Sequence, residues 1–526
     1  MRRLDVGVLD VVSPPVRTLW SRLMNANFAS IMPQVVGAWC ERAGHRVHYS
    51  CYTGIGDPLA ELPDRLDLLF IGAFTHAAHF AYALSNLFRR RGTVTVLGGP
   101  HARCYPEDAA RYFDYVVGFT DRAVVEEVLR DCAPHRPLGR RLAAASQPAE
   151  LAPLAERWKF VEAALSKAPT FKLVPMIGSL GCPYDCGFCI DSTVEYRSLG
   201  LDQLREDLRF LLTRTPRPIV GWHDPNFGVR FDACMDAIEG AVPPGRIRHL
   251  AESSLSLLTE AHLVRLRRNG FQALLPGVES WYELGRKSRT RLTGLEKVRH
   301  VSEQLNLILR YVPYVRTGFV LGLDSDHGAE PFELTKRFEE LSPGVFPGFA
   351  LLTAFGRAAP LNLEYQSAGR VLPFPFHLLD NHSANNVRPR HYAWPAFYDR
   401  VLDLLRYSHT GPRLARRFAA TRGVPRWVHL LSSLSSEGRG RIRYLTTVRR
   451  LLHTDPTMLR FMNAETDVLP AFYRDRLRRE LGTMYNLLPA GALDHDHLAY
   501  LESETASARA VRTQAGTLEV LLEGGY

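Results

Sequence analysis

Short apolar runs alternate with amphipathic segments through the first quarter of this 526-residue chain. The runs at 6–11 and 66–74 have the length of strands, and the second is almost continuously apolar, as a strand buried on both faces should be. Segments of helical character occur between such runs, at 30–43, 77–90 and 122–131. Repeated strand–helix units predict an α/β fold with a parallel, doubly wound sheet over residues 1–132. The ligand of such a sheet is expected at the carboxyl ends of its strands.

The same alternation resumes near residue 171, after a segment of different character. Residues 133–156 are rich in Pro, Arg, Ala and Gln and lack apolar periodicity, which predicts a linker. Beyond the linker the chain has six runs with strand character, at 173–182, 218–222, 250–254, 273–278, 315–323 and 348–353. After residue 395 the signals become helical, and we expect residues 396–526 to form a separate helical domain.

Three of the eight cysteines, Cys182, Cys186 and Cys189, lie within eight residues in the spacing C-x3-C-x2-C. Eight cysteines in a chain of this length are too few for a disulfide scaffold. Tetrahedral zinc normally needs a fourth Cys or His, and no suitable partner motif lies nearby. A cubane iron–sulfur cluster accepts three thiolates and leaves its fourth iron open for another ligand. Phe188 and two neighbouring glycines suit a loop wrapped closely around such a group.

The strand-like segment 173–182 and the C-x3-C-x-Φ-C loop that follows it together resemble the radical S-adenosylmethionine (SAM) superfamily. This resemblance implies a partial (β/α)6 barrel over residues 157–395. It also implies a 4Fe-4S cluster held by Cys182, Cys186 and Cys189, with SAM on the open iron. In that family an electron from the cluster cleaves the sulfonium and produces a 5′-deoxyadenosyl radical, which abstracts hydrogen from carbon.

Two strand ends of the predicted barrel resemble SAM-binding segments of the same family. Gly277-Val278-Glu279-Ser280 resembles the G-x-E segment, whose carboxylate contacts SAM, although a solvated acid at a strand end is the alternative. The segment 318–322 resembles the G-x-I-x-G strand that packs against adenine, but Ser325 replaces the usual acid between two aspartates. The resemblance implies SAM contacts from Phe188, Gly277, Glu279, Ser280, Gly318, Val320 and Gly322.

Two further barrel residues have open roles. His223 lies in a turn that resembles the D-x-N-F turn of the family, so it either contacts substrate or cofactor or is a polar loop residue. Arg316 precedes the predicted adenine strand, and it pairs either with a carboxylate of a ligand or with one of the protein itself. The segment 351–372 resembles the T-P-F-P-G-T…G-R-I segment of cobalamin-type members, with both prolines replaced.

The N-terminal block resembles the Rossmann-like cobalamin-binding domain that precedes the barrel in one subclass of these enzymes. The resemblance rests on the Gly98-Gly99-Pro100-His101 turn after a strand, on the segment 115–118 and on the position before the cysteine loop. The loop at 10–19 has no D-x-H-x-x-G motif, so it offers no histidine as a lower cobalt ligand. A degenerate or empty Rossmann-like domain is the alternative. The implied cobalamin contacts are Thr75, Gly98, Gly99 and His101.

Composition and charge indicate which partners this chain is expected to bind and where it is expected to be located. The hydrophobic fraction of 46% and the charged fraction of 23% are those of ordinary globular proteins. The excess of ten positive charges is concentrated in arginine-rich segments after residue 410, which we interpret as a solvated surface without a stable nucleic-acid partner. An acid at Asp5 interrupts any signal-peptide core, and no apolar run approaches the ~20 residues of a membrane span. The chain is therefore expected to be a cytoplasmic protein.

The leading hypothesis for function is a cobalamin-dependent radical SAM C-methyltransferase. It would act on an unactivated carbon of a small-molecule or lipid biosynthetic intermediate, using a 5′-deoxyadenosyl radical and methylcobalamin, with the helical domain as a cap over the barrel mouth. Ring formation or oxidative rearrangement with the same cofactors is the first alternative, and a non-catalytic cobalamin or redox sensor is the second. An external electron donor such as flavodoxin or ferredoxin is implied.

Overall fold

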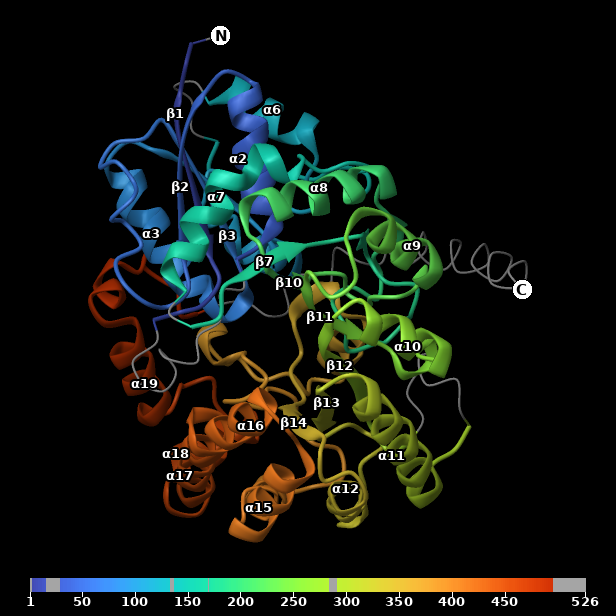
Figure 1. The fold of residues 1–526 in the computed structure, drawn as a ribbon. Coiled ribbons are helices and arrows are strands. Elements are labelled where there is room, and N and C mark those ends of the chain that lie inside the picture. The colour runs from blue at the N-terminus through green and yellow to red at the C-terminus, as the bar shows by residue number, and fades with distance from the viewer. Residues whose placement is uncertain (1, 16–28, 133–136, 169, 283–290, 495–526) are drawn as a thin grey trace.

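The computed structural model describes residues 2–15, 29–132, 137–168, 170–282 and 291–494. Its N-terminal domain is built on a six-stranded parallel sheet with the strand order β2-β1-β3-β4-β5-β6 (Figure 1). These strands are β1 (Asp5–Val11), β2 (Arg46–Tyr52), β3 (Leu68–Ala73), β4 (Val94–Gly98), β5 (Tyr115–Val117) and β6 (Arg140–Leu142). The predicted doubly wound α/β domain is confirmed.

Helices cover both faces of this sheet, as the strand–helix alternation requires. Helix α2 (Ile31–Arg42) and α6 (Arg122–Asp131) pack on one face, where their apolar side chains join a buried cluster with the strands. Helix α3 (Ala78–Arg90) packs on the other face, in a larger cluster that continues into the barrel. The α6 boundary is set by Asp121, whose carboxylate accepts a hydrogen bond from Val124 N at 2.9 Å.

The structure differs from the expected linker at 133–156. Strand β6 adds to the sheet as a parallel neighbour of β5, with Tyr115 opposite Arg140. Helix α7 (Leu154–Lys167) begins in the same segment and contacts α2 and β2. A three-residue edge strand that reads Arg-Arg-Leu carries no apolar pattern, because its side chains are half-buried or exposed and its two arginines form ion pairs with Glu127, Asp131 and Glu107.

The second domain is a curved parallel sheet with the strand order β14-β13-β12-β11-β10-β7. Because β7 and β14 remain at opposite edges, the barrel is partial, as expected. Its strands are β7 (Leu173–Met176), β10 (Ile219–Trp222), β11 (Arg248–Ser253), β12 (Phe271–Glu279), β13 (Tyr314–Leu321) and β14 (Phe346–Leu351). The outer helices are α8 (Leu201–Arg214), α9 (Phe231–Ala241), α10 (Glu260–Arg268), α11 (Gly294–Tyr311) and α12 (Glu330–Leu341).

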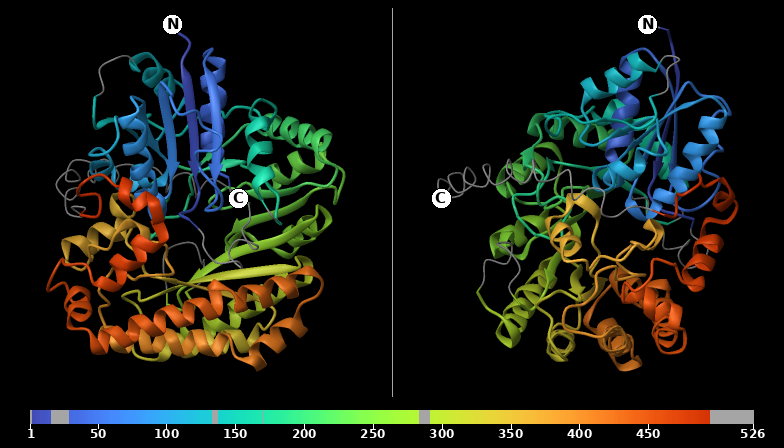
Figure 2. Two further views of the ribbon diagram at one scale, coloured as in Figure 1. Left: turned by 90° about the vertical axis from the view of Figure 1, so that its left-hand side faces the viewer. Right: turned by 180° about the vertical axis from the view of Figure 1, so that it is seen from behind.

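The chain after β14 folds into one further set of helices. They are α13 (Pro360–Ser367), α14 (Trp394–Ser408), α15 (Gly411–Ala420), α16 (Val424–Leu434), α17 (Arg441–Thr454), α18 (Pro456–Met462) and α19 (Ala471–Leu481), with a final turn η7 (Gly482–Leu487). Figure 2 shows these helices below the N-terminal domain and beside the barrel sheet. None of the helices within the described residues is long and apolar enough to cross a membrane.

The C-terminal helices flank the barrel, and their expected role as a cap over the barrel mouth stays a prediction. They pack along β14, the edge strand without a strand on its outer side. Arg441 on α17 donates a hydrogen bond to Phe349 O, and Leu351 N donates to Asn381 O at 2.7 Å. The reason is physical, since the backbone groups of a buried edge strand need partners. The turn η7 instead contacts α3 of the N-terminal domain, where Asn86 Nδ2 donates to Leu487 O at 2.8 Å.

Candidate functional site

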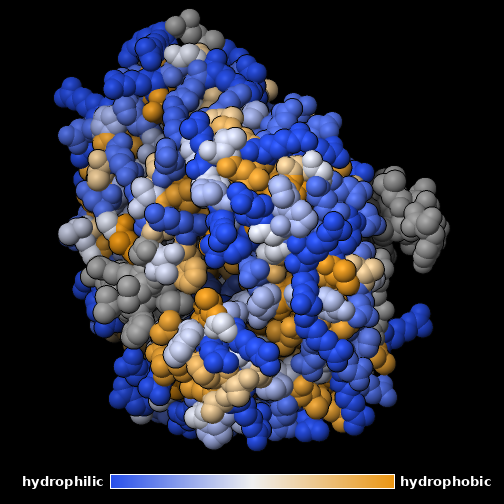
Figure 3. Space-filling model, viewed as in Figure 1, coloured by the Kyte–Doolittle hydropathy of each residue, from blue (hydrophilic) through white to orange (hydrophobic). Residues whose placement is uncertain are grey.

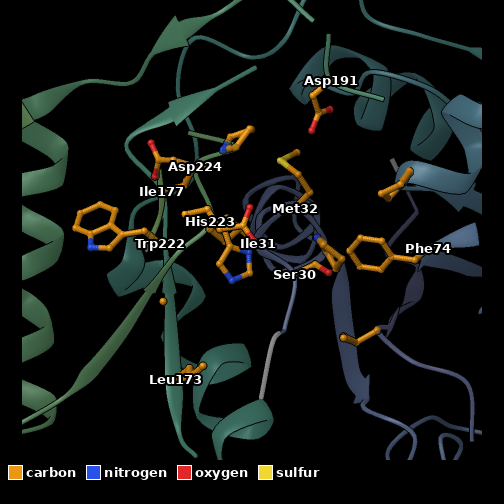
Figure 4. A pocket seen from close by; sticks show the side chains of 18 of the residues that line it. Ser30, Ile31, Met32, Phe74, Leu173, Ile177, Asp191, Trp222, His223 and Asp224 are labelled. Carbon is orange, nitrogen blue, oxygen red and sulfur yellow. The ribbon is translucent and has the colours of Figure 1, made fainter. Parts of the chain in front are cut away.

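A large cavity lies between the two sheets and has a volume of about 1260 Å³. Its N-terminal wall consists of residues at the carboxyl ends of β3, β4 and β5, including Phe74, Gly98 and Gly118. Its other wall is the inner surface of the barrel, including His223 and Arg316. Figure 4 shows side chains from both walls directed into this space. The two domains therefore present their strand ends to one shared chamber.

The cysteine loop leaves the barrel through a tight turn. A short antiparallel pair, β8 (Ser179–Leu180) and β9 (Arg197–Ser198), closes the base of the loop. Between them Gly181 has φ +69°, and a Cβ there would lie 2.2 Å from Glu195 O. Only glycine fits that conformation in that space. The loop therefore turns back on itself directly before Cys182.

Cys182, Cys186 and Cys189 are half-buried thiols on this loop. Burial, with smaller contributions from the Asp191 carboxylate and from Cys186 and Cys182, raises the pKa of the Cys189 thiol to about 11, although a hydrogen bond from Asp191 N opposes the rise. Among the described residues no three Cys, His, Asp or Glu side chains converge on a point where one metal ion would sit. A cubane cluster binds three thiolates at three separate irons and leaves its fourth iron open, so three cysteines grouped on one loop can hold it.

The buried carboxylate of Asp224 and a backbone N–H of α13 hold the ends and the middle of the cysteine loop. Asp224, after β10, accepts hydrogen bonds from Gly178 N at 3.0 Å and Ser179 Oγ at 2.5 Å. Burial raises the pKa of Asp224 to about 6, and these hydrogen bonds oppose the rise. Leu361 N, from α13, donates to Gly187 O at 2.8 Å and so fixes the middle of the loop from the opposite side.

The predicted SAM segments meet at a smaller cavity of about 220 Å³. Gly277, Glu279 and Gly318 line it, together with Asn226, Glu252 and Ser253 from neighbouring strand ends. Glu279 has φ +64°, an unusual conformation for a residue with a side chain, which directs it out of the regular path of β12. Carboxylates and unsubstituted glycines at adjacent strand ends can accept a ligand that carries an ammonium group and ribose hydroxyls.

Other predicted SAM residues lie beside this cavity but not on its wall. Ser280 is buried, and its Oγ accepts a hydrogen bond from Tyr282 N at 3.1 Å. Val320 packs on a small apolar cluster that includes Leu323 and Leu352. Gly322 has φ +96°, and its N donates to Asp326 Oδ2 at 2.9 Å.

Asp326 is the buried acid of the turn after β13. The sequence alone could not distinguish it from the neighbouring Asp324. The Asp326 carboxylate accepts hydrogen bonds from Gly322 N and Leu323 N, while burial raises its pKa to about 6. Asp324 forms two hydrogen bonds of 2.7 Å with Arg370. The two aspartates therefore fix the turn that follows the strand rather than face the small cavity.

On the N-terminal wall, the predicted cobalamin residues separate into two groups. Gly98 and Gly99 line the large cavity, and a Cβ on Gly99, whose φ is +88°, would lie 3.0 Å from Ala73 O. Thr75 and His101 are buried behind this wall. The His101 ring is hydrogen-bonded to Tyr82 Oη at 2.7 Å, so it is part of a buried polar group. Its predicted cofactor contact remains a prediction.

The large cavity also extends as an apolar cleft into the N-terminal domain. The cleft separates the sheet from α2 and α6, and its walls are the aliphatic and aromatic side chains Val8, Val36, Phe70, Val96, Val117, Val124, Val125 and Val128. Sequence analysis did not identify this cleft, because these residues have the pattern of an ordinary core. An elongated apolar cleft continuous with a glycine-lined wall can accept a large flat ligand with an apolar extension.

His223 and Arg316 form the polar part of the barrel wall. Burial lowers the pKa of His223 to about 4, and the charge of Arg157 contributes in the same direction. The ring is therefore neutral near pH 7. Arg316 forms an ion pair with Glu437, which lies after α16. Of the two partners expected for Arg316, the structure therefore shows a carboxylate of the protein itself. Arg316 lines both cavities.

Comparison with known proteins shows similarity in sequence to two enzymes and similarity in structure to a third. No protein-family model matches the chain. It is 23% identical to bacteriochlorophyllide d C-12(1)-methyltransferase of Chlorobaculum tepidum over 310 residues, which are 57% of this chain and 66% of that protein. It is 32% identical over 126 residues to bacteriochlorophyllide d C-8(2)-methyltransferase of the same organism, covering 24% of this chain and 28% of that protein. The chain thus matches less than two thirds of the length of either relative.

The structural likeness extends over more of the chain. The radical SAM methyltransferase TsrM from Kitasatospora setae, solved with cobalamin and a [4Fe-4S] cluster, aligns with 84% of this chain and 99% of its own at a TM-score of 0.50 and 14% identity. The same enzyme with tryptophan and a SAM analogue gives a TM-score of 0.51 at 15% identity, over 85% and 99% of the two chains. At this identity the likeness establishes the fold. The chain therefore has the fold of this radical SAM methyltransferase, and the fold that the sequence resemblance implied is confirmed.

Proposed function

We propose that this chain is a cobalamin-dependent radical SAM methyltransferase that methylates an unactivated carbon of a small, largely apolar molecule. One observation carries the proposal: a single cavity of about 1260 Å³ joins the strand ends of both domains. A pocket for one drug-sized ligand has roughly 300–1,000 Å³. The chamber therefore has room for the facing parts of two cofactors and a substrate.

The barrel would supply the radical. Cys182, Cys186 and Cys189 would hold a 4Fe-4S cluster, and Glu279 with its neighbouring glycines would bind SAM beside it. When bound, these groups provide a 5′-deoxyadenosyl radical that removes a hydrogen atom from carbon, and cobalamin provides the methyl group. Asp224 and Gly181 keep the cysteine loop in one conformation, which preserves the direction of that radical.

The N-terminal domain would hold cobalamin. Gly98, Gly99 and Gly118 leave the wall without side chains, so a flat macrocycle can approach the backbone closely. The apolar cleft between the sheet and α2 would accept the extended tail of the cofactor. These two features of the described residues fit the group, although the loop at 10–19 offers no histidine.

The substrate is proposed to be largely apolar with a negatively charged group. Aliphatic and aromatic side chains form most of the cavity wall. Arg248 lies on the wall at the amino end of β11, and among the described residues no ion pair with it is found. The similar proteins from Chlorobaculum tepidum act on a bacteriochlorophyllide, a pigment of this general character. We therefore infer a tetrapyrrole-like carboxylate as the first substrate class to test.

His223 would position this substrate. Its neutral ring at the end of β10 can accept or donate one hydrogen bond within the chamber. An external one-electron donor such as flavodoxin or ferredoxin would reduce the cluster. We also infer a reducing cytoplasmic location, because eight cysteines in 526 residues are too few for a disulfide scaffold.

The decisive experiment is anaerobic reconstitution followed by turnover. The purified chain would be loaded with iron, sulfide and hydroxocobalamin, and its ultraviolet–visible spectrum would report both cofactors. It would then receive SAM, a reductant and bacteriochlorophyllide d, with S-adenosylhomocysteine and 5′-deoxyadenosine measured together. Methyl transfer predicts one S-adenosylhomocysteine and one 5′-deoxyadenosine for each methylated product. Product formation without S-adenosylhomocysteine would indicate rearrangement instead, and Cys182→Ala should abolish both nucleoside products.

A further inference from the structure

One surface of the C-terminal helices combines exposed apolar and basic side chains. Helices α15 and α16 form a hairpin in which Trp427 packs edge-on against Phe418, with ring centroids 5.1 Å apart. Val424 is nonetheless 67% exposed and Trp427 is 55% exposed. We call this surface the α15–α16 patch, and its exposed side chains are Ala415, Arg416, Ala419, Arg422, Val424 and Trp427.

The charge carried by the α15–α16 hairpin itself is of one sign. From Leu404 to Ser436 the chain has six arginines and no aspartate or glutamate. Acids on α12 neutralise two of these arginines, since Arg413 pairs with Glu340 and Arg417 with Glu339. Arg416 and Arg422 remain exposed, and among the described residues no ion pair with either is found. The patch therefore presents net positive charge beside its apolar side chains.

The patch adjoins the large cavity. Along α16, Val424 and Val428 line the cavity, as do Ser432 and Ser435 farther on, at the spacing of one helix face. Trp427 lies on the adjacent face, about 60° around the helix axis from Val424. Figure 3 shows apolar side chains over α16 and a hollow in the surface above it. One helix thus contributes to the chamber wall and to the exposed patch.

We propose that the α15–α16 patch docks this protein on the surface of an anionic lipid bilayer. Tryptophan and valine partition into the boundary between headgroups and acyl chains, and arginines interact with anionic headgroups. A nucleic acid would be expected to require stacked aromatics along a basic groove, whereas the patch has a single exposed aromatic ring. Docking places the opening of the chamber beside the membrane, where an apolar substrate accumulates.

Flotation with lipid vesicles tests the proposal on the full-length chain. We expect the protein to float with vesicles of phosphatidylcholine and phosphatidylglycerol in a 7:3 ratio, and to float less with phosphatidylcholine alone. Binding should fall as salt rises, because exposed charges are screened. Arg416→Glu with Arg422→Glu should weaken binding roughly twentyfold or more, since each basic residue contributes about fivefold near an anionic surface. Val424→Asp with Trp427→Asp should also weaken binding by roughly tenfold or more.

Control variants distinguish a loss of membrane binding from a loss of folding. Val264 is 51% exposed on α10, away from the patch, and Val264→Asp should float like the wild type. Circular dichroism and iron content should be unchanged in all variants. Equal flotation of the patch variants, no flotation with either vesicle, or preferred binding to single-stranded RNA would each overturn the proposal. Because flotation requires neither SAM nor cobalamin, these outcomes do not depend on the proposed activity.

Discussion

The guanidinium group of Arg103, on α4 (Pro100–Cys104) of the N-terminal domain, lies 3.0 Å from the carboxylate of Asp191, two residues beyond Cys189. Arg103 also donates a hydrogen bond to Ile190 O at 2.6 Å, and its planar group stacks over Phe119 at 4.8 Å. One arginine therefore links the turn after β4, which lines the cavity, to the end of the cysteine loop.

Replacement of this arginine should loosen the cysteine loop. We expect Arg103→Gln to lower the iron content after reconstitution several-fold and to speed loss of the cluster absorbance in air, because the loop end loses its two hydrogen bonds to α4. Iron and sulfide analysis with a time course near 420 nm measures both effects. Arg122→Gln, on an exposed ion pair of the same domain, is the control and should change neither. Unchanged iron content in Arg103→Gln would mean that the loop holds its conformation alone.

Gly99, in the turn after β4, should be required because a side chain there would contact the backbone of Ala73. This contact adds to the strain of the left-handed conformation. Gly99→Ala places a Cβ 3.0 Å from Ala73 O on the cavity wall. Gly44 has the same φ of +88° but open space around its Cβ position. The left-handed conformation should cost each alanine about 1–2 kcal/mol of stability, and the close contact should add to this cost in Gly99→Ala. Only Gly99→Ala should lose cobalamin, with a dissociation constant at least tenfold higher by absorbance titration. Equal affinity in the two variants would exclude this wall as the cofactor surface.

Buried His249 should make stability dependent on pH. Burial lowers the pKa of His249 to about 3, whereas the unfolded value is 6.5, and its Nδ1 accepts a hydrogen bond from Trp222 Nε1 at 3.2 Å. The unfolded chain therefore binds more protons between pH 3 and 6.5. Stability from this group is full above pH 6.5 and falls as pH decreases, by about 1.4 kcal/mol per unit.

The measurement compares urea unfolding at pH 7.5 and pH 5.5. The wild type should lose more stability between these values than His249→Asn, which cannot titrate. The quantity compared is the change in the free energy of unfolding between the two pH values. A constant loss of stability caused by the substitution cancels in this difference. Identical slopes would show that the His249 ring titrates equally in both states.

His223 should affect the substrate and leave the cofactors in place. His223→Gln retains a polar group of similar length but cannot mimic both ring nitrogens. We expect unchanged iron and cobalamin content, a product rate at least tenfold lower, and continued 5′-deoxyadenosine formation uncoupled from product. His453→Gln, an exposed position on α17, is the control. A proportional fall in both products would instead place His223 at the SAM site.

Local patterns predicted much of the fold. Helix α6 was expected at 122–131, and the structure has it at Arg122–Asp131, because apolar periodicity and a cap residue are encoded in adjacent positions. Apart from β6, the strands of both sheets were expected from their apolar runs, within a few residues of their ends. Edge strand β6 was not expected, because half-buried and exposed residues held by backbone pairing leave no side-chain pattern.

In the candidate site, too, the residues in short motifs were identified from the sequence, whereas those placed by long-range packing were not. The cysteine spacing and the glycines at 98, 99, 277 and 318 were identified from short motifs, and the structure places these glycines on cavity walls. Arg103 and the apolar cleft were not identified. Arg103 resembles any surface arginine until its distance to Asp191 is known, and the valines of the cleft resemble core residues until α2 is placed against the sheet.

By itself, the sequence determined which groups are available: three clustered thiols, flexible turns after strands, and the order of strands and helices. Only the tertiary structure decided which of these groups share a space. Residues 98 and 223 are far apart along the chain, yet both line one cavity, because each is at the carboxyl end of a parallel strand and the two domains enclose the same space. That arrangement depends on long-range packing, which no local pattern encodes.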